Sequence, residues 1–245
     1  MSHLLDENVF AIRLKYLEER LCLYRPFLRP ATVGVMNRAI FGRDFAGSTD
    51  VSALSLLSTF VAICQPSRVL ELGTYHGFST LILADLLASN ERPGRIVTVD
   101  PNAAAQAAAR ERVAEAGLAG VVRFVCGCSD DEQVLEAVGA DAPFDMLYID
   151  TSHQYEATLA ELEMYLVRRP LVRPGALIFL HDITFPMGGD AGVGPAVEHW
   201  LARHPDFRYL PLTSAGIWPN PCGLGILLKP TAPAGAAPAP GAADD

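Results

Sequence analysis

The stretch VLELGTYHGFST, residues 69–80, decides the fold of this chain. Its first four residues, VLEL, read as a short buried strand, and an apolar helical pattern begins at Phe78. Gly73 and Gly77 lie between the two. A strand, a glycine turn and a helix start together present backbone N–H groups to a polar ligand. The stretch therefore predicts a ligand-binding loop and raises the question of which ligand it holds.

From Arg68 onward, expected strands and helices alternate along the chain. The strand candidates are 68–72, 95–99, 121–126, 144–149 and 176–180, and the helical stretches between them are 78–88, 103–116, 130–138 and 155–169. Apolar strands joined by helices are typical of a parallel sheet covered on both faces. Two later strand candidates, 206–212 and 223–229, are close enough in sequence to form a hairpin. We expect an α/β, Rossmann-like, doubly wound fold.

The two ends of the chain differ from this central part. Apolar residues recur at helical spacing over 10–24, so residues 1–47 predict a helical extension that caps the domain or makes a homo-oligomer contact. Asp50 is placed to cap a following helix. Residues 230–245 form a Pro/Ala/Gly tail whose composition predicts disorder. The expected main domain is 48–229.

Composition limits the partners and the compartment. The net charge is −9 and no dense Lys/Arg block occurs, which argues against a nucleic-acid partner. No apolar run reaches the ~18–20 residues of a membrane span, and the N-terminus lacks the apolar core of a signal peptide. The five cysteines form no metal-binding pattern and indicate a reducing compartment. We therefore expect a cytoplasmic protein without membrane or nucleic-acid partners.

The glycine turn does not match a dinucleotide fingerprint. That fingerprint, G-x-G-x-x-G, lets the backbone approach a pyrophosphate closely, but the run here is G-T-Y-H-G with Tyr75 at the second glycine position. This argues against a nicotinamide dehydrogenase, and no phosphate loop of the G-x-x-x-x-G-K-[ST] type occurs. Asp100 ends the second strand, where an acidic side chain can accept hydrogen bonds from both ribose hydroxyls.

Four segments in order along the chain, ELGTYHGFS, VTVDP, VCGCSDD and the run from YIDTSH to LIFLHD, resemble the motifs of class I S-adenosylmethionine-dependent methyltransferases. They are most similar to the catechol-type and the sugar-modifying "family 24" O-methyltransferases, over residues 48–229. The resemblance implies a seven-stranded sheet with one antiparallel strand. It also implies cofactor contacts from Glu71, Gly73, Thr74, Gly77, Ser79, Asp100, Ser129 and Asp130, with the methionine end of the cofactor at Glu71 and Gly73.

Two strand-end aspartates predict a metal site. Asp150 and Asp182 follow neighbouring strands, so their carboxylates should converge at one rim and suit Mg²⁺. Catechol-type enzymes carry Asp at both positions and Asn after the second, where this chain has Ile183. Some sugar-modifying relatives carry an acidic residue just before the second Asp, where this chain has His181. The resemblance thus implies a metal held by Asp150, His181 and Asp182, and a nitrogen ligand leaves room for Mn²⁺, Fe²⁺ or Zn²⁺.

His153 is the candidate general base. It lies three residues after Asp150 and matches the position of the catalytic lysine in catechol-type enzymes. A histidine titrates near neutrality, which suits removal of a hydroxyl proton beside the Asp150 carboxylate. His76, inside the glycine turn, either touches cofactor or substrate or packs within the loop.

The reading that these residues favour is an S-adenosylmethionine-dependent, metal-assisted O-methyltransferase acting on a hydroxyl of a small molecule. A sugar or natural-product acceptor is favoured over a free catechol because His153 and His181 depart from the catechol pattern. Selectivity should come from the N-terminal helices, loop 184–195 and loop 213–222. Two alternatives stay open: metal-assisted hydroxylation or other non-methylating chemistry on the same fold, and an inactive cofactor-binding protein.

Overall fold

The computed structural model describes residues 28–41, 49–184, 191–213 and 222–231. The expected helix over 10–24, half of loop 184–195, most of loop 213–222 and the tail after 231 lie outside these ranges. The division into 1–47, 48–229 and 230–245 therefore stays a prediction. Among the described residues, none of the helices has both the length and the apolar character that crossing a membrane demands.

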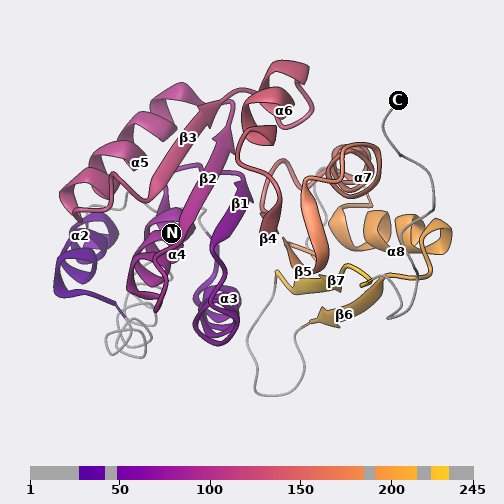
Figure 1. Cartoon of the computed structure of the whole chain (residues 1–245), viewed down its shortest axis with the longest axis horizontal. Coiled ribbons are helices and arrows are strands. Elements are labelled where there is room, and N and C mark those ends of the chain that lie inside the picture. Colours follow the sequence, from indigo (N-terminus) through magenta and orange to yellow (C-terminus); the bar gives the residue numbers. More distant parts are fainter. Residues whose placement is uncertain (1–27, 42–48, 185–190, 214–221, 232–245) are drawn as a thin grey trace, which may run out of the picture.

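A seven-stranded sheet forms the centre of the molecule, with strand order β3-β2-β1-β4-β5-β7-β6 (Figure 1). The strands are β1 (Arg68–Leu72), β2 (Arg95–Asp100), β3 (Val122–Cys126), β4 (Phe144–Ile149), β5 (Val172–His181), β6 (Arg208–Leu212) and β7 (Leu224–Leu228). β1 to β5 pair in parallel, and β7 runs antiparallel to both of its neighbours. The single antiparallel strand within a mostly parallel sheet confirms the predicted fold class.

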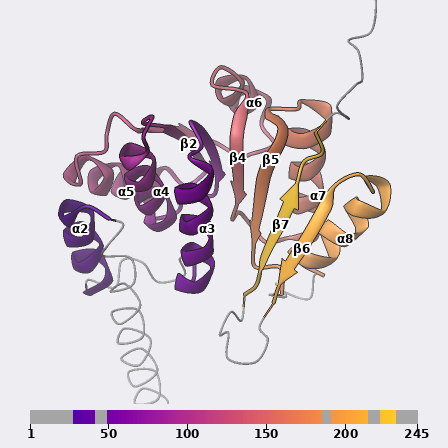
Figure 2. The same ribbon diagram turned by 60° about the horizontal axis from the view of Figure 1, so that its bottom comes forward.

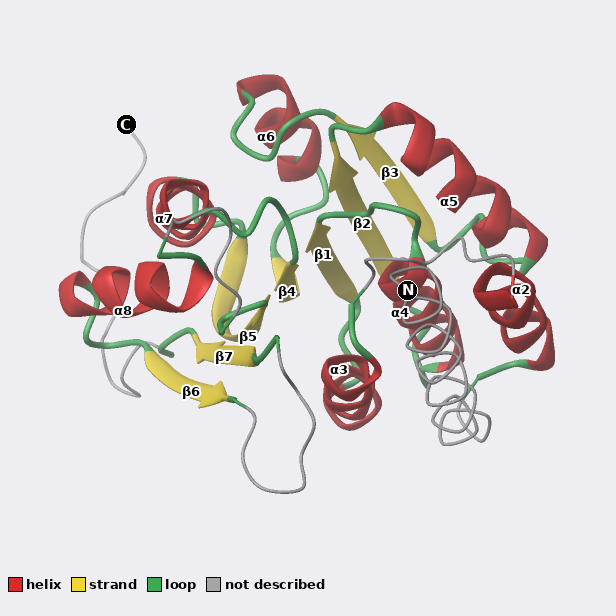
Figure 3. Cartoon of the chain, turned by 180° about the vertical axis from the view of Figure 1, so that it is seen from behind, coloured by secondary structure: helices red, strands yellow, loops and turns green. Residues whose placement is uncertain are grey.

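Helices cover both faces of this sheet (Figures 2 and 3). They are α2 (Pro30–Phe41), α3 (Val51–Cys64), α4 (Phe78–Ser89), α5 (Ala103–Glu115), α6 (Glu132–Gly139), α7 (Tyr155–Glu163) and α8 (Val193–Arg203), with a π-helical turn, η1 (Met164–Arg168), after α7. Residues of α2 to α5 share one apolar cluster with the sheet, and residues of α6 to α8 share the other. In β1, Val69 joins the first cluster while Leu70 and Leu72 join the second, as expected of a strand buried on both faces.

The parallel register brings the functional strand ends to one edge. Leu72 lies opposite both Val99 and Ile149, so β1, β2 and β4 end at the same level. Ile149 in turn pairs with Leu180 of β5. The polar residues that follow these strands therefore project from one rim of the sheet, the rim at which open α/β sheets bind ligands.

Candidate active site

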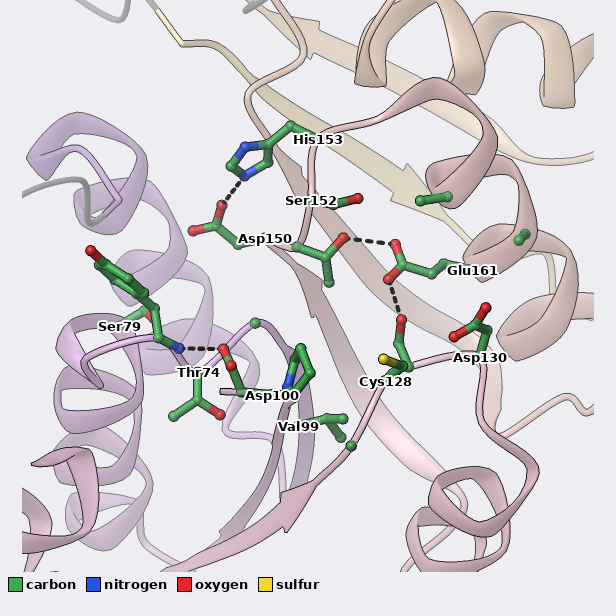
Figure 4. A pocket seen from close by; sticks show the side chains of 18 of the residues that line it. Thr74, Ser79, Val99, Asp100, Cys128, Asp130, Asp150, Ser152, His153 and Glu161 are labelled. Atoms are coloured by element: carbon green, nitrogen blue, oxygen red, sulfur yellow. Dashed lines mark hydrogen bonds and ion pairs between the residues drawn. The ribbon is translucent and has the colours of Figure 1, made fainter. Parts of the chain in front are cut away.

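A cavity of about 570 Å³ opens at this rim, and all the sequence motifs contribute to its wall (Figure 4). Asp100 and Thr74 lie on one side of the cavity. Cys128, Asp130 and Glu161 lie on a second side, and Asp150 and His153 lie on a third. Of the predicted cofactor residues, those lining the cavity are Gly73, Thr74, Ser79, Asp100, Ser129 and Asp130. Glu71 and Gly77 are not among the lining residues.

Gly73 and Gly77 are required for different reasons. The backbone of Gly73 has φ 102°, and a Cβ there would lie 1.9 Å from the carbonyl oxygen of Asp150, so only glycine lets the ends of β1 and β4 meet. Gly77 has φ 80° and begins α4, and a Cβ there would lie 2.6 Å from that of Ala109 on α5. Gly73 thus shapes the cavity, whereas Gly77 allows helices α4 and α5 to pack closely together.

Glu71 holds the glycine turn in place through side-chain hydrogen bonds. Its side chain is fully buried and accepts hydrogen bonds from the hydroxyls of Ser79 at 2.6 Å, Thr80 at 2.5 Å and Thr98 at 2.7 Å. Burial raises the pKa of Glu71 to about 7, against the lowering effect of these three hydroxyls. The carboxylate therefore ties the start of α4 to β1 and β2 and keeps the turn in place.

Asp100 is held rigidly at the cavity wall. Its Oδ2 accepts the N–H of Tyr75 at 2.7 Å, and its Oδ1 accepts the N–H of Asn102 at 2.7 Å. The side-chain cap of α5 comes from Asn102, whose Oδ1 accepts the N–H of Ala105. Since each carboxylate oxygen can accept more than one hydrogen bond, Asp100 keeps acceptor capacity toward the cavity.

Glu161 on α7 is a cavity residue that the sequence did not reveal. It is 3% exposed, accepts from Ser129 Oγ at 2.6 Å and from Thr151 Oγ1 at 3.0 Å, and burial raises its pKa to about 7. The one usable signal was its spacing, because it lies three residues after Thr158 and beside Leu162 on the buried stripe of the helix. A carboxylate on such a stripe needs polar partners.

Asp150 belongs to a cluster of four side chains next to the cavity. Ligand atoms of Asp150, His153, His181 and Asp182 all lie within 4.8 Å of one another. His153 Nε2 is 2.9 Å from Asp150 Oδ1 and 3.0 Å from Asp182 Oδ2. His181 Nδ1 is 3.2 Å from Asp150 Oδ1 and 3.3 Å from Asp182 Oδ1. Two carboxylates and two imidazoles form a donor set that fits a divalent cation. Ile183 is buried in the apolar core and offers no ligand.

The charges of this cluster are strongly coupled. Burial alone would raise the pKa of Asp150, but the charge of His181 and hydrogen bonds from His153, His181 and Thr49 hold it well below its usual range. Burial would lower the pKa of His181, but the Asp150 charge and hydrogen bonds to Asp150, Asp182 and Asp50 hold it well above its usual range. The pKa of His153 is raised in the same way, against burial, by Asp150 and Asp182. A cationic group is thus favoured between the two aspartates.

Thr49 and Asp50 reach the cluster from the start of α3. Thr49 Oγ1 donates to Asp150 Oδ2 at 2.7 Å, and the hydroxyl of Tyr148 donates to the same oxygen at 2.9 Å. Asp50 caps α3, as predicted, and its Oδ2 is also 3.0 Å from Nε2 of His181. No sequence pattern pointed to the second contact, since 131 positions separate the two residues.

Three residues of the site adopt left-handed backbone conformations. Among the described non-glycine residues, positive φ occurs at Gln65, Tyr75 (44°), His153 (60°) and Asp182 (58°). Gln65 is the C-cap of α3, where this conformation is common. The other three belong to the cavity or to the four-residue cluster. Such strain costs about 1–3 kcal/mol each and concentrates at functional sites.

His76 does not line the cavity. Its ring packs against that of Tyr75 with centroids 4.0 Å apart, and its Nδ1 is buried without a hydrogen-bond partner. Of the two roles considered for His76, packing within the loop matches this placement.

The chain is similar in sequence to known methyltransferases. A family model described as a methyltransferase domain matches residues 70–183, from β1 to the residue after Asp182. A catechol O-methyltransferase of Niastella koreensis is 32% identical over 130 residues, 52% of this chain and 54% of that protein. One from Sus scrofa is 30% identical over 137 residues, 55% of this chain and 70% of that protein. The chain spans about half the length of most of the curated relatives it matches.

The fold recurs in solved structures. The O-methyltransferase TomG from Streptomyces achromogenes, which is involved in tomaymycin synthesis and was solved in complex with SAM, superimposes with a TM-score of 0.65. It shares 23% identity, and the match covers 87% of this chain and 96% of that one. By its motifs, its fold and its curated relatives, the chain belongs to the class I S-adenosylmethionine-dependent O-methyltransferase family that includes the catechol O-methyltransferases.

Proposed function

We propose that the protein transfers a methyl group from S-adenosylmethionine to a hydroxyl oxygen of a small molecule, assisted by a divalent cation. The observation that carries this proposal is a shared wall: Asp150 and His153 line the cavity and also belong to the four-residue cluster. A methyl donor in the cavity and an acceptor hydroxyl at the cluster would therefore meet at these two residues. Methyl transfer needs this in-line proximity of donor and nucleophile.

The cavity suits a nucleoside cofactor. Its volume of about 570 Å³ is in the usual range for small-molecule sites. Gly73 allows close approach to the backbone, Asp100 is fixed where a ribose needs acceptors, and Ser129 and Asp130 offer polar groups for the adenine. When bound, S-adenosylmethionine supplies an electrophilic methyl group on sulfur.

The cluster suits activation of the acceptor. Asp150, His181 and Asp182 would hold the cation, which lowers the pKa of a hydroxyl bound to it. The two carboxylates match Mg²⁺, and the imidazole also admits Mn²⁺, Fe²⁺ or Zn²⁺. Once the cation balances the charge of Asp150 and Asp182, the neutral imidazole of His153 would accept the hydroxyl proton and release it to solvent, since its side chain is 23% exposed.

A sugar or natural-product hydroxyl is the proposed acceptor, in preference to a free catechol. Two residues support this preference, His153, which stands where the catechol-type pattern has lysine, and His181, which also departs from that pattern. TomG, which shares the fold, is involved in tomaymycin synthesis. A cytoplasmic location and the absence of nucleic-acid partners remain part of the same proposal.

A second candidate is hydroxylation of a small molecule at a bound ferrous ion, in which one atom of O₂ enters the substrate and a two-electron co-substrate reduces the other to water. The observation that favours it is the presence of two imidazoles beside carboxylates, the ligand types of non-haem iron oxygenases. The two reactions are separated by product mass, because one adds a methyl group and the other adds an oxygen atom.

Calorimetry on EDTA-treated protein provides the first test. S-adenosylmethionine, S-adenosylhomocysteine and NAD are titrated separately, with and without Mg²⁺. We expect both sulfur ligands to bind and NAD to give no heat. Hydroxylated sugars and natural products are then screened with isotope-labelled methyl donor. The absence of binding heat from both S-adenosylmethionine and S-adenosylhomocysteine would refute the methyltransferase proposal.

A further inference from the structure

Asp50 and His181 form a buried pair that joins helix α3 to strand β5. His181 is 4% exposed and is the last residue of β5, and its Nε2 lies 3.0 Å from Asp50 Oδ2. The other oxygen of Asp50, Oδ1, accepts the N–H groups of Ser52 at 2.9 Å and Ala53 at 3.0 Å. One carboxylate oxygen is thus fixed by the helix and the other faces the histidine.

This arrangement determines which nitrogen of His181 is free to bind a metal. A carboxylate oxygen only accepts, so Nε2 must donate its hydrogen to Asp50. Nδ1 then faces Asp150 Oδ1 and Asp182 Oδ1, at 3.2 and 3.3 Å. When a cation lies between those carboxylates, the neutral ring presents the Nδ1 lone pair to it. A carboxylate behind a ligating histidine commonly fixes the ring and its tautomer in this way.

We propose that Asp50 is a positioning residue that makes His181 Nδ1 the nitrogen ligand of the metal site. This inference rests on the proposed function, because it concerns the cation of that site. It places one ligand and its support on segments 131 positions apart in the sequence. It also predicts that Mn²⁺ and Zn²⁺ bind more tightly than Mg²⁺, because imidazole is a better donor for them.

The opposite side of the His181 ring is the competing location. Asp50, His181 and Cys222 also have donor atoms within 4.8 Å of one another. However, this group offers a single carboxylate, whose Oδ1 caps the helix and whose Oδ2 faces the imidazole. The Nδ1 side instead offers two carboxylates to the ion.

Asp50→Asn is the decisive variant because it keeps the helix cap and reverses the contact with the histidine. Asparagine caps helices as well as aspartate does, so its oxygen stays with Ser52 and Ala53. Its NH₂ group then replaces Oδ2 and donates to His181 Nε2. The ring proton must move to Nδ1, where it blocks the lone pair. Asp131→Asn, the same change at the N-cap of α6, is the matched control.

The experiment uses the full chain, treated with EDTA and loaded with Mn²⁺ as a paramagnetic probe. Pulsed electron paramagnetic resonance detects nitrogen bound directly to Mn²⁺, and the signal of free Mn²⁺ gives the affinity. The spectrum is recorded in the His153→Ala background, where His181 is the remaining histidine of the cluster. We expect the nitrogen signal to persist there and to disappear when His181→Ala is added.

The affinities make the role of Asp50 measurable. Asp50→Asn should weaken Mn²⁺ binding by about 10- to 100-fold, as is usual for a residue that supports a ligand. Asp131→Asn and Cys222→Ser should bind as the wild type does. In the His181→Ala background, Asp50→Asn should have no further effect, because its partner is gone.

Several outcomes would overturn the inference. These are a spectrum without bound nitrogen, unchanged affinity in Asp50→Asn, a further loss in the double variant, or weaker binding in Cys222→Ser. Calorimetry of S-adenosylmethionine on the same samples keeps the two proposals apart. Cofactor binding together with an oxygen-only Mn²⁺ site, or with no Mn²⁺ site, would reject the role of Asp50 and leave methyl transfer standing.

Discussion

Gly73 lies directly against the backbone of Asp150, so the glycine turn and the four-residue cluster of Asp150, His153, His181 and Asp182 share one point of contact. A Cβ on Gly73 would be 1.9 Å from the Asp150 carbonyl oxygen. Any side chain there would push apart the ends of β1 and β4. In the proposed reaction, cofactor binding and acceptor activation would therefore depend on the same close approach of two strands.

Gly73→Ala should reduce both stability and cofactor affinity. The residue has φ 102°, and the added methyl group would meet the backbone of Asp150, so the loss should exceed the ~1–2 kcal/mol of left-handed strain alone. Gly117→Ala is the control for strain, since Gly117 has φ 71° and, apart from its chain neighbours, no atom lies within 4 Å of the place its added methyl group would occupy. Urea unfolding and calorimetry measure the two effects. Equal losses in the two variants would contradict the contact.

Asp100→Ala should weaken S-adenosylmethionine binding by at least about 10- to 100-fold, the loss expected when one hydrogen bond to a charged acceptor, worth about 1.5–3 kcal/mol, is removed. Asn102→Ala is the matched control, since Asn102 caps α5 beside Asp100. Calorimetry should show near-normal affinity in that control. Unchanged affinity in Asp100→Ala would remove this residue from the cofactor site.

Glu161→Gln should change how stability depends on pH. The pKa of Glu161 is about 7 in the folded protein, against a reference value of 4.5. The folded state therefore holds a proton between these values that the unfolded state releases, so wild-type stability falls as pH rises from about 4.5 to 7. The variant lacks this titration and should gain on the wild type by up to about 3 kcal/mol above pH 7.

Urea unfolding of the wild type and Glu161→Gln at several pH values checks this. Glu71, with a similar raised pKa, is present in both proteins and cancels in the comparison. A stability difference that is the same at pH 5 and pH 8 would show that Glu161 titrates normally.

His153→Ala should lower the methyl-transfer rate at neutral pH by about 10²- to 10⁴-fold, the usual contribution of a general base. Partial recovery is expected at higher pH, where the acceptor hydroxyl ionises without help. Cofactor affinity should stay unchanged. His199→Ala, on the exposed side of α8, serves as the control histidine. Full activity of His153→Ala at neutral pH would refute the base role.

Asp182→Asn should leave cofactor binding intact and reduce metal-dependent turnover. Asparagine tolerates the left-handed backbone at this position, where φ is 58°, so the fold is kept. Loss of a supporting residue costs about 10- to 100-fold, and loss of a ligand should cost at least roughly 100-fold. EDTA should inhibit the wild type similarly, and Asp206→Asn at the surface should behave as the wild type. Turnover that survives both EDTA and Asp182→Asn would exclude a role for the metal.

The sequence predicted what depends on periodicity and on strand ends. β1 was expected at 68–72 and is found there, and the polar residues after β1, β2 and β4 meet because parallel strands end at one edge. The limits predicted for two elements were wrong. β5 begins at Val172 rather than at 176, and the α-helix expected over 155–169 ends at Glu163 and is followed by the π-helical turn η1.

Contacts between distant segments were not predictable in the same way. Thr49 meets Asp150, and Asp50 meets His181, although about a hundred positions or more separate the partners. Neither residue belongs to a motif, and a helix cap is by itself a common feature. Glu161 was hidden because a glutamate on a helix is ordinarily solvent-exposed, and only the packing of α7 shows that it is buried.

The left-handed conformations of Tyr75, His153 and Asp182 have a consequence for protein engineering. Glycine or asparagine at these positions would relieve backbone strain, so a selection for heat resistance alone should enrich such replacements. Each of them would also remove a side chain from the cavity or from the metal cluster. Thermostability and turnover should therefore trade against each other at these three positions, whereas substitutions elsewhere on the scaffold can raise one without lowering the other.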